Sequence, residues 1–173
     1  MPVMFQLDSF TTHRFSGNPA AVVVLDAFPM DEVMQAVAAE NNLAETAFLV
    51  ADGPDYRLRW FTPLVEVPLC GHGTLASAAV VMERLERSRE QVTFHTASGP
   101  LYVQRRGASY VMDFPVRHAA PVAMPADVLD VLGVEPLEFL GNEFNYLAVL
   151  DSARTVRRLQ PNLAAIALWN SPG

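Results

Sequence analysis

Apolar and polar residues follow two different spacings along the first two-thirds of the chain. A continuous β-branched run at 20–25 is typical of a buried strand, whereas the period-two alternation at 56–60 is typical of a half-buried one. Between them, residues 31–41 place apolar side chains at helical spacing, with Asp31 near the expected N-cap. Shorter apolar stretches predict further strands at 5–8, 46–50, 92–96, 101–105 and 110–114.

A second helix is predicted over 74–87. Its apolar residues recur at three- to four-residue spacing, at Leu75, Ala78, Ala79, Met82 and Leu85. Turns at 98–100 and 107–109 separate the three strands that follow this helix. Hairpins next to a core-facing helix predict an α+β fold, in which a mixed or antiparallel sheet wraps around the helix.

The chain changes character after residue 115. Three prolines and no periodicity between 115 and 125 predict a linker at 116–125. We therefore expect a complete N-terminal α+β half at 1–115 and the start of a second half at 126–173. Short helices are expected in that second half at 126–132 (ended by Gly133), 152–159 and 163–169.

An internal echo links the two parts. Gly17-Asn18 and Gly141-Asn142 each precede an apolar strand that ends in Leu-Asp and leads into a helix. This echo predicts a duplicated unit. Repeating the interval from Gly17 to Cys70 after Gly141 would pass the last residue, so the second copy is expected to be incomplete.

Composition narrows the classes of function. Half of the 173 residues are apolar, which is enough for a core, and the net charge of −7 without a basic stripe argues against nucleic acid as a partner. All 12 basic residues are arginine, so the chain lacks the lysine that a pyridoxal Schiff base or a P-loop needs. One cysteine, no signal peptide and no membrane span indicate a cytoplasmic protein.

The glycine-rich turn at 68–76 is the first candidate for chemistry. It places Gly71 and Gly73 at the start of the predicted 74–87 helix, where free N–H groups and the helix dipole favour an anion. The alternative is that these glycines only mark the start of the helix. Within the turn, Cys70 is either a thiolate base or an inert buried thiol. His72 is either a proton donor and substrate ligand or a backbone cap.

Glu45 is the second candidate. It lies between apolar neighbours at the entry to a predicted buried strand, where burial would raise its pKa toward neutrality and suit it to proton transfer. The alternative is an edge glutamate in water. No metal site is expected, because the four histidines show no ligand spacing and one cysteine cannot build a structural zinc site.

Several motifs in order resemble the PhzF-like phenazine biosynthesis proteins. They are Asp8-Ser9-Phe10, Phe15-Ser16-Gly17-Asn18-Pro19-Ala20-Ala21-Val22, Leu43-Ala44-Glu45-Thr46-Ala47-Phe48, Arg59-Trp60-Phe61-Thr62-Pro63, Glu66 through Ala76, and Asp113-Phe114-Pro115. The resemblance is strong over residues 1–115, and 141–163 look like the start of that family's second half.

This resemblance implies the diaminopimelate-epimerase-like fold, with two α+β halves and an active site between them. It implies an isomerase or epimerase without a cofactor, acting on a small carboxylate-bearing metabolite. Separately, we expect a homodimer or larger self-association, because an incomplete second half would expose apolar surface. Glu45 would be the acid/base. Asn18, Gly71, His72 and Gly73 would bind the substrate, and Cys70 would be a secondary candidate base.

Three hypotheses follow. The first is the isomerase just described. The second is a non-catalytic, truncated remnant that binds a ligand or partner, because the family's Asp-Pro-x-Thr-Gly turn of the second half does not occur in these residues. The third is a proline-racemase-like enzyme that uses Cys70 as its base.

Overall fold

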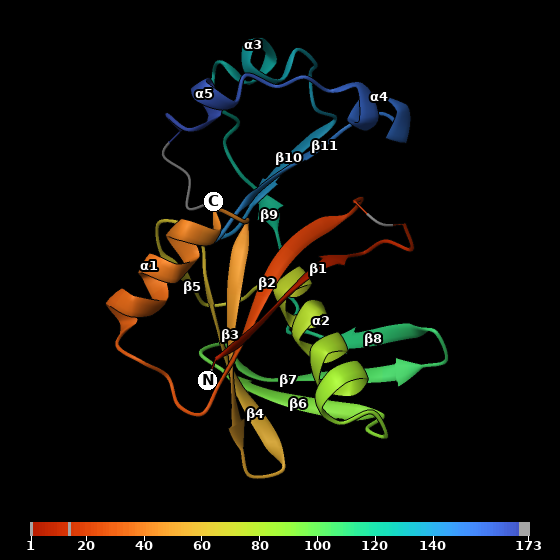
Figure 1. Cartoon of the computed structure of the whole chain (residues 1–173). Coiled ribbons are helices and arrows are strands. Elements are labelled where there is room, and N and C mark those ends of the chain that lie inside the picture. The colour runs from red at the N-terminus through yellow and green to blue at the C-terminus, as the bar shows by residue number, and fades with distance from the viewer. Residues whose placement is uncertain (1, 14, 170–173) are drawn as a thin grey trace. The chain divides into compact units, whose positions relative to one another are not determined.

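The computed structural model describes residues 2–13 and 15–169, and the chain divides into two compact units, Met1–Phe114 and Pro115–Gly173. The first unit is a curved sheet with one helix on each face (Figure 1). The predicted α+β class is confirmed. Within the described residues, no helix has the length and apolar character needed to cross a membrane.

The sheet of the first unit has eight strands in the order β1-β2-β3-β4-β6-β7-β8, with β5 paired to β4. The pairs β2–β3 and β4–β6 are parallel, and the other pairs are antiparallel. The strands are β1 (Val3–Ser9), β2 (Asn18–Leu25), β3 (Glu45–Asp52), β4 (Asp55–Phe61), β5 (Glu66–Val67), β6 (Gln91–Thr96), β7 (Gly99–Arg106) and β8 (Ser109–Asp113). Each parallel pair is joined through a helix, because parallel strands need a crossover connection.

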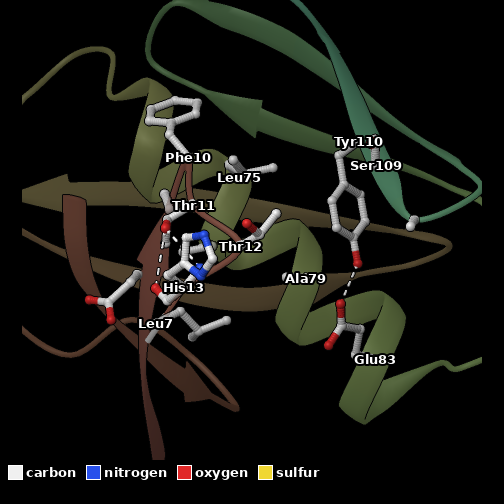
Figure 2. Close-up of a pocket in the computed structure, with 14 residues that line it drawn as sticks. Leu7, Phe10, Thr11, Thr12, His13, Leu75, Ala79, Glu83, Ser109 and Tyr110 are labelled. Atoms are coloured by element: carbon white, nitrogen blue, oxygen red, sulfur yellow. Dashed lines mark hydrogen bonds between the residues drawn. The ribbon is translucent and has the colours of Figure 1, made fainter. Parts of the chain in front are cut away.

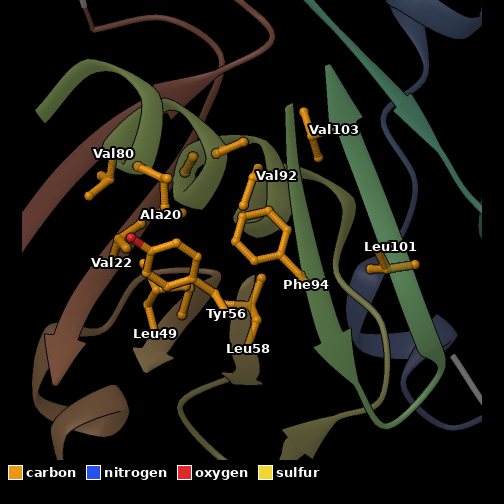
Figure 3. Close-up of a cluster of buried hydrophobic side chains, with 14 of the residues drawn as sticks. Ala20, Val22, Leu49, Tyr56, Leu58, Val80, Val92, Phe94, Leu101 and Val103 are labelled. Atoms are coloured by element: carbon orange, nitrogen blue, oxygen red, sulfur yellow. The ribbon is translucent and has the colours of Figure 1, made fainter. Parts of the chain in front are cut away.

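Side chains of β2 to β4 alternate between two cores. Even positions of β2, such as Ala20 and Val22, face helix α2 (Gly71–Val80) in the larger core, together with Leu58 and Phe94 (Figure 3). Odd positions, such as Val23, face a smaller core under helix α1 (Asp31–Asn41). This two-sided burial explains why residues 20–25 read as continuously apolar.

Helix α1 begins where the sequence predicted, but its cap differs. Met30 occupies the N-cap without a side-chain hydrogen bond, and Asp31 is the first helical residue. The Asp31 carboxylate accepts a hydrogen bond of 2.9 Å from Arg59 of β4, which also binds Glu66 of β5. Asp31 therefore ties the start of α1 to the sheet instead of capping the helix.

Helix α2 begins three residues earlier than the predicted start at Thr74, so Gly71, His72 and Gly73 form its first turn. It continues into a π-helical turn, Val81–Leu85. Glu86 follows this turn and accepts a hydrogen bond from the Tyr56 hydroxyl of β4. The central helix of the first unit is thus fixed to the sheet at its C-terminal end.

Over its described residues, 115–169, the second unit has a three-stranded sheet in the order β11-β10-β9 and three short helices. Its elements are β9 (Ala120–Pro121), α3 (Val128–Leu132), β10 (Glu138–Gly141), β11 (Tyr146–Val149), α4 (Ala153–Arg158) and α5 (Leu163–Ile166). The predicted linker thus contains a short strand, because β9 pairs with β10. Gly133 ends α3 with φ of 71°, as its position predicted.

The two Gly-Asn dipeptides occupy different places in their units. Asn18 is the first residue of β2, whereas Asn142 lies in the turn after β10, where its side chain accepts hydrogen bonds from the N–H groups of Phe144 and Asn145. Gly17 has φ of 93°, whereas Gly141 is the last residue of β10. The sequence echo therefore marks a hairpin followed by a helix in both units, but not the same turn.

Candidate active site

Glu45, Cys70 and His72 come together at one end of the first unit. Glu45 is the first residue of β3, and the other two lie at the start of α2. The His72 ring stands between its partners, with Nε2 3.2 Å from Glu45 Oε2 and Nδ1 3.4 Å from Cys70 Sγ. The structure thus joins two candidates that lie 25 residues or more apart in the sequence.

Cys70 caps helix α2. Its Sγ accepts a hydrogen bond of 3.3 Å from the Gly73 N–H, and its carbonyl accepts one from the Thr74 hydroxyl. Burial, and next the neighbouring carboxylate of Glu45, raise the pKa of the Cys70 thiol to about 12. The group is therefore a neutral thiol at pH 7, with its sulfur oriented by the helix start.

His72 has neighbours at its backbone carbonyl and at its ring. Its side chain is 8% exposed, and its carbonyl accepts a 2.8 Å hydrogen bond from the Ser9 hydroxyl at the end of β1. Neither His72 Nε2 nor Glu45 Oε2 makes an aligned hydrogen bond to another described residue, although 3.2 Å separates them. Two buried polar atoms thus face each other without a satisfied bond, which is costly unless a ligand or proton completes the pair.

Gly73 is required by the indole of Trp60 on β4. A Cβ at position 73 would lie 2.8 Å from Trp60 Cδ1 and 3.1 Å from Cys70 Sγ. Trp60 is 1% exposed, and its Nε1 has no hydrogen-bond partner among the described residues. The glycine therefore lets the first turn of α2 pack directly on the sheet.

The other two predicted binding residues lie near this cluster in the fold. Gly71 is the first residue of α2, and a Cβ there would meet only the Phe114 ring, at 3.5 Å. Asn18 pairs with Ser9 in the β1–β2 ladder and lies two residues before Ala20, the parallel neighbour of Glu45. Residues near 18, 45 and 71 thus meet at one end of the unit, although the Asn18 side chain makes no described contact with the cluster.

Sequence spacing did not indicate two further features of this site. The Glu45, Cys70 and His72 ligand atoms all lie within 4.8 Å of one another, a grouping of metal-ligating side chains that the spacing of the histidines did not indicate. The contact of Ser9 with His72 was also not predicted, because a single serine at a strand end gives no sign that its hydroxyl will bind the backbone of a distant histidine.

A separate groove of about 710 Å³ lies between the end of β1, α2 and the start of β8 (Figure 2). Its charged groups are engaged: Asp8 accepts a hydrogen bond from the Phe15 N–H, and Glu83 accepts one from the Tyr110 hydroxyl. Glu45, Cys70 and His72 do not line this groove. We therefore assign the candidate chemistry to the Glu45–His72–Cys70 cluster and not to the groove.

The family model described as phenazine biosynthesis-like protein matches residues 7–171. The chain belongs to the PhzF-like phenazine biosynthesis family. Within this family, an uncharacterized isomerase from Pseudomonas aeruginosa is 48% identical over 163 residues, covering 94% of this chain and 62% of the relative. Another from Halalkalibacterium halodurans is 44% identical over 172 residues, covering 98% of this chain and 65% of the relative.

A solved structure of the family has a fold similar to that of this chain. A PhzF family protein from Enterococcus faecalis superposes with a TM-score of 0.87 at 37% identity, covering 98% of this chain and 65% of the other. The predicted epimerase-like fold is thereby confirmed. The chain spans slightly less than two-thirds of the length of these PhzF-like relatives.

Proposed function

We propose that this PhzF-like chain moves a proton on a small carboxylate-bearing metabolite, with Glu45 as the acid/base. The observation that carries the proposal is the approach of Glu45 Oε2 to His72 Nε2, 3.2 Å away, beside the N-terminus of α2. A carboxylate next to a set of helix N–H groups is suited to removing a proton while negative charge develops nearby.

The start of α2 would hold the substrate carboxylate. The first N–H groups of a helix have no partner within the helix, and the N–H of Gly73 is already bound to Cys70. The N–H of His72 also faces the Cys70 thiol, so the substrate would use the N–H group of Gly71, together with the positive end of the helix dipole. Asn18, which precedes the Glu45-paired part of β2, would contribute a further polar contact.

The proton pathway would run through Glu45. Its carboxylate takes a proton from a carbon activated by a neighbouring unsaturated or carboxylate group, and Glu45 or an opposing acid returns a proton at another position. A hydrogen bond from the neutral Cys70 thiol to Nδ1 of His72, 3.4 Å away, would place the ring proton on Nε2, facing Glu45. His72 would thereby orient the carboxylate, and no cofactor is needed in this scheme.

The surroundings of Cys70, which raise its pKa, argue against this residue as the base. A pKa of about 12 leaves almost no thiolate at neutral pH. We therefore place Cys70 in an orienting role and favour Glu45 over a proline-racemase-like mechanism.

Deuterium incorporation from solvent into candidate amino acids or cyclohexadiene acids tests the proposal. We expect Glu45→Gln to slow exchange by about 10²–10⁴-fold, because general acid–base catalysis supplies that factor. Glu40→Gln, on the exposed face of α1, is the matched control and should exchange like wild type. Equal exchange by Glu45→Gln and wild type would exclude the assigned role, whereas binding without exchange by wild type would favour a binding module.

We also propose a cytoplasmic homodimer, with no nucleic-acid partner. A net charge of −7 and a lone buried cysteine support the compartment and the absence of nucleic acid. Support for self-association comes from β1, an edge strand of the sheet whose Val3 and Met4 side chains are 49% and 55% exposed. An exposed apolar edge strand favours pairing with another chain.

A further inference from the structure

The Glu45–His72–Cys70 cluster combines three kinds of metal ligand in one buried place. A thiol, an imidazole and a carboxylate contribute one ligand atom each, and these atoms lie within 4.8 Å of one another. Cys70 and His72 are buried and Glu45 is half-buried. Glu45 Oε2 is also buried without an aligned hydrogen bond among the described residues, as is the second ring nitrogen of His72, Nε2, whereas Nδ1 faces Cys70 Sγ.

The spacing fits a tetrahedral ion. Typical zinc–sulfur and zinc–nitrogen bonds at a tetrahedral angle put the two ligand atoms about 3.5 Å apart. Cys70 Sγ and His72 Nδ1 are 3.4 Å apart, and Glu45 Oε2 lies 3.2 Å from the other ring nitrogen. Because one ion uses only one nitrogen of the ring, a rotation of the Glu45 carboxylate or of the imidazole would complete the third ligand.

We propose that Glu45, Cys70 and His72 form a binding site for one divalent cation of the zinc class, with the fourth position open. Sulfur and nitrogen donors select such an ion over magnesium or calcium, which prefer oxygen ligands. On binding, the S–H bond of Cys70 breaks, its electron pair coordinates the ion, and the proton passes to solvent.

The surroundings of the cluster already orient these ligands. The Gly73 N–H donates to Cys70 Sγ, and the Ser9 hydroxyl donates to the His72 carbonyl. Contacts of this kind hold ligands in place around protein-bound metals. The site would therefore need little backbone movement to accept an ion.

Occupation of the site would suppress proton transfer, a consequence that rests on the proposed function. The ion would engage the Glu45 carboxylate, so that its electron pair is no longer available to a substrate proton. The cluster would then have two exclusive states, a metal-free state competent for proton transfer and a metal-bound state that is inactive.

Titration of the full chain with Co²⁺ tests the site without any assay of catalysis. We expect one Co²⁺ per chain, with the absorption of tetrahedral cobalt and a sulfur-to-cobalt charge-transfer band, both lost on addition of Zn²⁺. Cys70→Ser should lose the charge-transfer band, and both Cys70→Ser and His72→Gln should bind at least about tenfold more weakly. Serine also caps helices, and circular dichroism verifies that each variant is folded.

His95→Gln is the matched control, because His95 also lies near a carboxylate, 3.5 Å from Asp55, but has no cysteine beside it. It should bind Co²⁺ like wild type. Absence of the charge-transfer band in wild type, or an unchanged band in Cys70→Ser, would overturn the site. The Glu45 role is tested separately, by deuterium exchange in chelator-treated protein, so failure of one proposal is distinguishable from failure of the other.

Discussion

Cys70 illustrates, at the scale of one residue, how surroundings change a side chain's chemistry. A cysteine at a helix N-terminus is a candidate thiolate, because the helix dipole lowers its pKa. Here burial and the neighbouring Glu45 outweigh the hydrogen bond from the Gly73 N–H, and the pKa rises to about 12. The local sequence indicated the dipole, whereas the effects that raise the pKa are burial in the folded chain and, next, the Glu45 carboxylate on a strand 25 residues away.

Alkaline pH should therefore destabilise the fold through Cys70. Its pKa rises from 9.0 to about 12 in the folded chain, so the stabilisation is complete below pH 9 and is lost as the pH rises toward 12. We expect the free energy of unfolding to fall by at most about 1.4 kcal/mol per pH unit in this window. Urea unfolding at several pH values measures it.

Two variants separate this effect from the titration of Tyr56, whose pKa burial and the hydrogen bond to Glu86 also raise to about 12. Cys70→Ser should flatten the stability profile between pH 9 and 10, below the range in which Tyr56 contributes. Tyr56→Phe should retain the decline between pH 9 and 10. An identical slope in wild type and Cys70→Ser would contradict the assignment.

At the scale of an element, the connection between β1 and β2 packs against a residue that supports the candidate site. Gly17 has φ of 93°, and a Cβ there would lie 2.3 Å from the Ser9 carbonyl oxygen and 2.9 Å from Thr11. Ser9 is the residue that holds the His72 carbonyl. The packing of this connection is thus coupled to the position of His72.

Gly17→Ala should destabilise the chain by roughly 3 kcal/mol, because it adds a backbone clash to the cost of a left-handed conformation. Gly53→Ala is the matched control, since Gly53 also has positive φ, of 59°, but no atom within 4 Å of the added Cβ. It should cost only about 1 kcal/mol. Chemical denaturation measures the free energy of unfolding of both variants. Equal losses of stability would show that neighbouring atoms move to relieve the clash at position 17.

At the scale of the whole molecule, the edge strand β1 is the feature with the clearest consequence. Light scattering should give about twice the 19.0 kDa mass of one chain if β1 pairs between copies. Met4→Lys should shift the mass toward one chain without loss of secondary structure, because a charged edge opposes pairing. A wild-type monomer at working concentrations would refute the proposed dimer.

Much of the first unit was predictable from the sequence by itself. The predicted strands at 20–25 and 56–60 and the helix at 31–41 all exist, because alternation and helical spacing record which faces are buried. The ordered motifs also indicated the PhzF-like family, which the family match confirms. Local pattern was sufficient for these features because each depends on neighbouring residues.

Tertiary structure alone decided the geometry of the candidate site. Parallel pairing of β2 with β3 places Glu45 at the strand end that meets α2, and the 3.2 Å approach to His72 results from that crossover. The Ser9 hydrogen bond, the Trp60 contact with Gly73 and the strand β9 within the expected linker likewise depend on partners far away in the sequence. Sequence spacing does not encode such distances, because the packing of whole elements sets them.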